Sequence, residues 1–186
     1  MTLVMGVDPG LTRCGVGLVR SGKSRAVEFV AVETITSDKD LELSARIGSI
    51  ANRIETLILE HKPNRIALER VFSQANLRSV MGTAQISGVV FFLANKHGIP
   101  IQLHTPTEVK AAVTGSGRAA KAQVGEMVKR ILKLEEVPKP ADAADSLAIA
   151  ICNAWRTTDA SAGSQQTSAQ QTWKAAIAAS QRNKGR

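Results

Sequence analysis

Four acidic side chains stand at positions where their chemistry can be used. Asp8 ends the apolar run Leu3–Val7, and Glu69 ends a second short apolar run. Asp142 and Asp145 follow one another at helical spacing, so both lie on one face of a predicted helix together with residues that should be buried. Carboxylates that meet in a partly buried site repel one another unless a cation compensates their charge.

Hard divalent cations are the natural compensation for such a cluster. Mg²⁺ or Mn²⁺ prefers oxygen ligands, and two ions in one site can clamp the attacking and leaving oxygens of a phosphodiester. Asp8, Glu69, Asp142 and Asp145 therefore predict a two-metal site that hydrolyses phosphodiesters in line, with water as the nucleophile and no covalent intermediate. A Ser or Cys nucleophile has less support, because no His has an evident nucleophile partner. Asp142 and Asp145 also fit a purely structural role, since first-turn acids are favoured by the helix dipole.

The elements that position these acids follow from the hydrophobic periodicity. The runs Leu3–Val7 and Cys14–Val19 predict a hairpin with Asp8 at its tip. A helix from about Asp40 to His61 leads into the strand that ends at Glu69, which predicts a parallel crossover and places Asp8 and Glu69 at the same edge of the sheet. Further strands and helices are expected over Arg25–Thr36 (an edge strand), Gln74–Lys96, Ile99–Leu103, Thr105–Val113, 124–132 and 141–156. The pattern predicts an α/β fold.

Two of these helices raise questions of packing. The helix over Gln74–Lys96 contains Gly82 and Gly88, which weaken a helix unless another backbone comes close. It is either a packed or subunit-facing helix, with a dimer as the consequence, or a plain core helix with tolerated glycines. The amphipathic helix over 124–132 is expected to pack on the sheet.

Composition limits the class of protein. The 186 residues carry a net charge of +8 and a pI near 9.9, which suits a polyanionic partner, although a basic surface can also be merely solvated. Aromatic residues make up 3%, so a nucleic acid would be held by its phosphates rather than by stacking. No apolar run is long enough to span a membrane, and no signal peptide is evident. Cys14 and Cys152 are expected to be reduced core thiols of a cytoplasmic protein.

The C-terminal part of the chain differs from the rest. Residues 1–156 are expected to form the catalytic domain. From Thr157 to Arg186 the chain is rich in Ala, Ser, Gln and Thr and carries four basic residues against one acid, which predicts a disordered basic tail.

Five motifs together resemble the RuvC family of bacterial Holliday-junction resolvases. They are Val7-Asp8-Pro9-Gly10-Leu11-Thr12-Arg13-Cys14-Gly15, Ala67-Leu68-Glu69-Arg70-Val71-Phe72, Met81-Gly82-Thr83-Ala84-Gln85, Thr105-Pro106-Thr107-Glu108-Val109-Lys110 and Asp142-Ala143-Ala144-Asp145-Ser146-Leu147-Ala148-Ile149-Ala150. The likeness extends from Leu3 to Arg156 with the motifs in the expected order.

The resemblance implies a ribonuclease-H-like fold with a mixed five-stranded sheet flanked by helices, a homodimer, and paired symmetric nicks in a four-way DNA junction. It also implies an association with the branch-migration proteins RuvA and RuvB. The family's four acidic positions fall on Asp8, Glu69, Asp142 and Asp145, and the role of Asp142 is the least fixed of the four because some members are thought to use His near the last helix. The resemblance places Phe72 near the junction centre and Lys110 and Lys121 near the scissile phosphate. Arg78 and Arg118 are further candidates for contacts with the DNA backbone.

Each of the DNA-facing positions also fits a role that needs no DNA. Phe72 could be a core side chain at the end of a strand, and each basic residue could be an ordinary solvated charge. His104 is expected to be a structural or surface residue.

Two further classes of protein fit part of the pattern. Asp8-Pro9-Gly10-Leu11-Thr12 resembles the first phosphate loop of actin-like ATPases, but 186 residues cannot hold the second lobe of those proteins. The other class is a non-catalytic junction-binding module, in which the acids only cap and pair.

Overall fold

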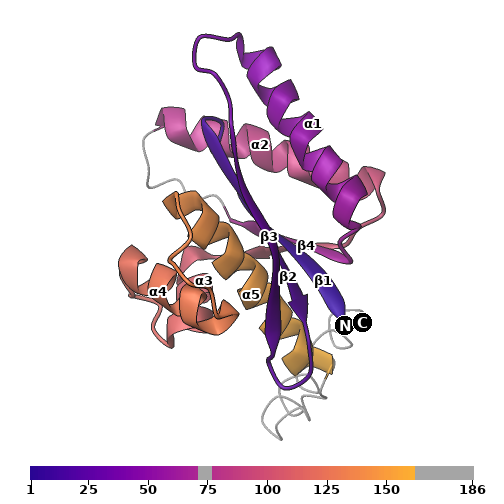
Figure 1. The fold of residues 1–186 in the computed structure, drawn as a ribbon. Coiled ribbons are helices and arrows are strands. Elements are labelled where there is room, and N and C mark those ends of the chain that lie inside the picture. Colours follow the sequence, from indigo (N-terminus) through magenta and orange to yellow (C-terminus); the bar gives the residue numbers. More distant parts are fainter. Residues whose placement is uncertain (71–76, 162–186) are drawn as a thin grey trace, which may run out of the picture.

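A five-stranded sheet with helices on both faces forms the body of the protein (Figure 1). The computed structural model describes residues 1–70 and 77–161, and only the backbone of 77–79 and 157–161. The strands are β1 (Thr2–Asp8), β2 (Arg13–Ser21), β3 (Val27–Thr36), β4 (Arg65–Glu69) and β5 (Ile101–His104). The helices are α1 (Leu43–His61), α2 (Leu77–Lys96), α3 (Pro106–Thr114), α4 (Lys121–Leu132) and α5 (Ala141–Ser161).

The strand order is β3-β2-β1-β4-β5, with β3 and β5 at the edges. The first three strands are antiparallel, whereas β4 and β5 run parallel to β1. The predicted α/β fold with a mixed five-stranded sheet is confirmed, including the Asp8 hairpin, the edge position of β3 and the parallel crossover through α1. Among the described helices, none is long and apolar enough to cross a membrane.

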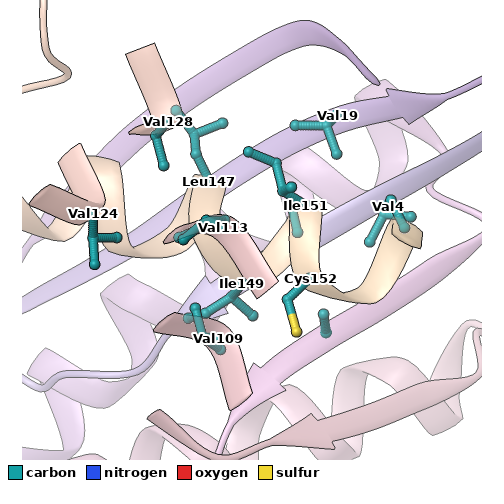
Figure 2. Close-up of a cluster of buried hydrophobic side chains, with 14 of the residues drawn as sticks. Val4, Val19, Val109, Val113, Val124, Val128, Leu147, Ile149, Ile151 and Cys152 are labelled. Carbon is teal, nitrogen blue, oxygen red and sulfur yellow. The ribbon is translucent and has the colours of Figure 1, made fainter. Parts of the chain in front are cut away.

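Alternation along the central strand separates two hydrophobic cores. Met5 and Val7 of β1 point to the face covered by α1 and α2, whereas Val4 points to the face covered by α3, α4 and α5. Figure 2 shows the second core, in which Leu147 and Ile151 of α5 are surrounded by side chains from the sheet and from α3 and α4. Asp8 falls in the same alternation as Val4, so it faces the α5 side of the sheet.

Two expectations about helices need correction. Helix α4 packs mainly on α5 and α3 and reaches the sheet chiefly at β3, because α5 already covers the central strands. Helix α5 continues past Arg156 to Ser161. The rest of the predicted tail lies outside the described residues, so the division at residue 156 stays a prediction.

Glycines let α5 lie directly on the backbone of β1 and β2. A Cβ atom at Gly6 would collide with the carbonyl oxygen of Ser146, and one at Gly15 would collide with the carbonyl oxygen of Asp142. A Cβ at Gly17 would come within 2.8 Å of the Leu147 backbone nitrogen. We call Gly6, Gly15 and Gly17 the glycine track. It sets how closely the N-terminal turns of α5 approach the sheet.

Gly6→Ala is expected to destabilise the protein by about 3 kcal/mol, because the added methyl group meets backbone atoms of α5 that cannot move aside. Thermal and urea denaturation measure this change. Gly48→Ala is the matched control: Gly48 lies inside α1 with nothing within 4 Å of an added Cβ, so the substitution should stabilise by about 0.5–1 kcal/mol. Equal stability of the two variants would contradict the role of the glycine track.

Candidate active site

The four predicted acids converge at one end of the sheet. Val7 of β1 pairs with Leu68 of β4, so Asp8 and Glu69 follow at the next position of two neighbouring parallel strands. Asp142 and Asp145 lie in the first two turns of α5, which the glycine track holds against β1 and β2. The convergence that the sequence predicted is therefore present, whereas the catalytic and metal-binding roles of Asp142 and Asp145 stay predictions. Their charges act on Asp8.

The turn that follows Asp8 is braced by three other elements. Ser37, just after β3, donates a short hydrogen bond from its hydroxyl group to the carbonyl oxygen of Leu11. Arg46 of α1 donates from Nε to Ser37 Oγ at 3.0 Å and from Nη2 to the Leu11 carbonyl oxygen at 3.4 Å. On the other side of the turn, a Cβ at Gly82 of α2 would come within 3.0 Å of the Leu11 Cβ. These contacts fix the end of β1 and with it Asp8.

Two basic side chains pair with the acids of α5. Arg13 Nε lies 2.9 Å from Asp142 Oδ2, and Lys121 Nζ lies 3.1 Å from Asp145 Oδ2. The Lys121 contact is also a hydrogen bond, whereas the Arg13 contact is an ion pair without hydrogen-bond geometry. Asp142 Oδ2 is consequently a buried oxygen with no hydrogen-bond partner in the described part of the chain. Both cations are themselves largely exposed.

The acids strongly disturb one another's ionisation. The pKa of Asp8 is raised to about 7, first because burial disfavours the charged form, and further by the negative charges of Glu69, Asp145 and Asp142. Burial and Asp145 also raise the pKa of Glu69. The pKa of Lys121 is raised as well, chiefly by the charge of Asp145 and the hydrogen bond to it. The site is thus short of positive charge.

The donor set fits a hard divalent cation. All four candidate ligands are carboxylates, burial and then the neighbouring acids raise the pKa of Asp8, and Asp142 Oδ2 is a buried acceptor without a hydrogen bond. In the present side-chain positions, however, no three His, Cys, Asp or Glu side chains of residues 1–70 and 77–161 stand close enough together to hold one ion. Arg13 and Lys121 pair with Asp142 and Asp145 instead. Arg13 and Lys121 therefore compete with a cation for Asp142 and Asp145.

The structure describes the side chains of only some of the residues predicted to contact DNA. Lys110 on α3 lies near enough to Glu69 for its charge to lower the pKa of that acid, against the larger effect of burial. Arg118 is exposed in the loop between α3 and α4. Phe72 lies outside the described residues, and the side chain of Arg78 is likewise not described, so both stay predictions.

His104 is a structural residue, as expected. It is buried beside Glu69 in the sheet register, with Nε2 3.0 Å from Asn153 Nδ2 and Nδ1 3.8 Å from Cys152 Sγ. Cys14 and Cys152 are buried free thiols, and burial raises the pKa of each.

The residues that support the acids are not evident from the sequence. Arg13 stands inside the first motif, immediately after the turn that ends at Thr12, and this position is the only local signal of its role. Ser37 and Arg46 carry no such signal. Nothing in the local sequence connects Arg46 with the turn, because their contact forms across the fold.

Known proteins share this chain's sequence over most of its length. The family model described as "Crossover junction endodeoxyribonuclease RuvC" matches residues 4–153. A relative of that description in Rhodococcus jostii is 59% identical over 82% of this chain and 81% of its own. Another, in Streptomyces griseus, is 56% identical over 82% of this chain and 75% of its own. The chain belongs to the RuvC family.

Solved structures agree with this assignment. The structure "T. thermophilus RuvC in complex with Holliday junction substrate" matches with a TM-score of 0.82 and 30% identity, covering 86% of this chain and 97% of that chain. The yeast mitochondrial Holliday junction resolvase Ydc2 matches with a TM-score of 0.58 and 14% identity over 83% of this chain and 80% of that one, which supports the fold alone. The ribonuclease-H-like fold implied by the resemblance is confirmed.

Membership of the RuvC family also confirms the expected enzyme class, a crossover junction endodeoxyribonuclease, which is a hydrolase. The competing interpretations as an actin-like ATPase or as a non-catalytic module lose their support. RuvC relatives match the stretch that contains the predicted phosphate-loop motif, so the motif belongs to the nuclease.

Asp8 should make the stability of the metal-free protein depend on pH. Its pKa is about 7 in the folded chain and near 3.8 when unfolded, so the folded state holds the proton more tightly and the free energy of unfolding falls as pH rises from about 4 to 7. Asp8→Asn removes this contribution, so at pH 8 the variant should be more stable than the wild type by up to about 4 kcal/mol. Denaturation at pH 4 and pH 8 in chelator measures the difference, with the exposed acid variant Asp40→Asn as control. A wild-type pH profile in Asp8→Asn would contradict the burial of an unfavourable charge at this position.

Proposed function

We propose that this chain resolves four-way (Holliday) DNA junctions in recombination and repair by nicking two opposed strands symmetrically, with Mg²⁺ or Mn²⁺ held by Asp8, Glu69, Asp142 and Asp145, two ions to a site. The observation that carries the proposal is the convergence of these carboxylates beside Lys110 and Lys121. The Thermus thermophilus relative, whose complex holds a Holliday junction substrate, supports the choice of DNA.

The four proposed metal ligands come from two different parts of the fold. The strand-end acids Asp8 and Glu69 belong to the sheet, whereas Asp142 and Asp145 enter from α5 and pair with Arg13 and Lys121. Once released, Lys121 is an exposed ammonium group at the mouth of the site, where it can pair with a phosphate oxygen. When bound, the metal ions supply Lewis-acid chemistry, offsetting charge on the phosphodiester and lowering the pKa of a water.

A second apolar face of α2 supports the proposed homodimer. Ile86, Val90 and Leu93 of this helix are buried in the core, yet Met81 and Phe92 on the other side are 53% and 65% exposed. Gly88 lies between those two on the helix surface, and an added Cβ there would meet nothing within 4 Å. A helix of a second copy can therefore approach closely at this point. Of the two interpretations of the glycines, this arrangement favours the subunit-facing helix.

The remaining parts of the proposal follow from the resemblance. We place Phe72 near the junction centre and Arg78 and Arg118 on the DNA backbone, and we expect RuvA and RuvB to act with this protein in the cytoplasm. The net charge of +8 suits a polyanionic substrate.

Asp8→Asn should bind a synthetic four-way junction with nearly wild-type affinity and lose at least a hundredfold in nicking rate, because it removes a metal ligand and no phosphate contact. Gel-shift titration in Ca²⁺ measures binding, and single-turnover cleavage in Mg²⁺ measures nicking. The exposed acid variant Asp40→Asn controls for the lost charge and should cut normally. Wild-type nicking by Asp8→Asn would refute the proposed mechanism, and ATP turnover by the wild type without cleavage would refute the function.

Phe92→Glu should give a monomer in sedimentation velocity while the thermal stability of the fold is kept, because the substituted side chain is exposed in the single chain. Junction nicks should then become uncoupled, one strand at a time. Leu59→Glu is the control, since Leu59 is 57% exposed on α1, away from the α2 face, and that variant should remain a dimer. If the Phe92→Glu variant remained a dimer, the subunit contact would not involve this face of α2.

A further inference from the structure

The exposed arginine that follows the Asp8 turn has no role in the function proposed so far. We propose that Arg13 is a substrate-gated side chain of the active site: in the free enzyme its guanidinium group holds Asp142 away from the other carboxylates, and on DNA binding it moves to a phosphate oxygen of the strand to be cut. This inference rests on the proposed function and adds a residue and an order of events to it.

The position of Arg13 follows from the backbone. The turn between β1 and β2 is closed around Gly10, where a Cβ would collide with the carbonyl oxygen of Arg13. Arg13 is the first residue of β2. It stands two positions before Gly15, which pairs with Asp8 in the sheet. By the alternation of the strand, Arg13 and Gly15 face the same side, which is the side of α5. The braced turn thus fixes the Arg13 backbone beside the carboxylates.

The geometry of the ion pair allows Arg13 to exchange Asp142 for another anion. The contact is a single ion pair at 2.9 Å through Nε, without hydrogen-bond geometry, and 58% of the Arg13 side chain is exposed. Because the guanidinium group is largely open to solvent, an incoming anion can reach Arg13 while it is still paired with Asp142. The contrast is Arg53, which binds Glu33 through two nitrogens at 2.8 and 2.7 Å. An ion pair that served only to hold α5 on the sheet would be expected to have two hydrogen bonds, as the Arg53–Glu33 pair does.

The chemistry of the guanidinium group selects a phosphate as the second partner. A guanidinium is planar, always charged and presents a fork of donors that matches a phosphate or carboxylate. A divalent cation that draws Asp142 into its coordination leaves Arg13 without its counter-charge at the mouth of an anion-binding site. A phosphodiester is the anion that the enzyme brings there. Metal binding therefore releases Arg13, and the DNA phosphate then binds it.

Arg13→Ala in the full-length protein should bind Mn²⁺ about two- to fivefold more tightly without DNA, since Asp142 no longer has a competing cation. Electron paramagnetic resonance of free Mn²⁺ measures this affinity independently of activity. The same variant should lose roughly tenfold or more in the single-turnover nicking rate at saturating metal, for want of a charge-assisted phosphate contact. Arg13→Lys should recover part of the rate. Arg20→Ala, which removes an exposed arginine of β2 paired with Glu28, should leave both values unchanged.

A double-mutant cycle separates exchange from a general charge effect. In an Asp142→Asn background, Arg13→Ala should no longer change the Mn²⁺ affinity, because the pair is already broken. Wild-type Mn²⁺ affinity or wild-type nicking in Arg13→Ala would overturn the proposal, as would an undiminished gain in affinity in the Asp142→Asn background. Absence of junction cleavage by the wild type would instead refute the proposed function, so the two failures are distinguishable.

Discussion

The contact between helix α5 and the backbone of the central strands decides where Asp142 and Asp145 lie relative to the strand-end acids Asp8 and Glu69. Side chains on the strands would hold a helix away from the sheet, but the glycine track has no side chains at the crossing. The carbonyl groups of Asp142 and Ser146 then rest against β2 and β1. An inward turn of α5 reaches the strand ends only because of this approach, so packing that looks structural is the precondition for the chemistry.

The close approach of α5 to the sheet brings the negative charges of the acids near one another. Burial and neighbouring acids raise the pKa of Asp8 to about 7, so the site is unfavourable for its own charges. Lys121 and Arg13 offset part of this charge from the rim, one through a hydrogen bond and the other through a looser ion pair. A site arranged in this way keeps an excess of negative charge that favours the binding of cations.

The site is also mechanically linked to the surface proposed for dimerisation. The turn after Asp8 is clamped by Ser37 and Arg46 on one side and by α2 at Gly82 on the other. The same helix exposes Met81 and Phe92 on its outer face. One helix therefore contacts the turn after Asp8 and also presents the apolar face proposed for dimerisation.

Local patterns in the sequence determined the elements and the identity of the acids. Alternation and helical periodicity placed Asp8 and Glu69 at the ends of parallel strands, because a strand or a helix is a property of a short run of residues, and the family motifs covered the same stretches. The tertiary structure alone decided which cations face those acids and how the turn is held. The pairing of Arg13 with Asp142 and of Arg46 with Leu11 joins residues distant in the chain. Such contacts depend on how closely α5 and α1 pack on the sheet, which no periodicity encodes.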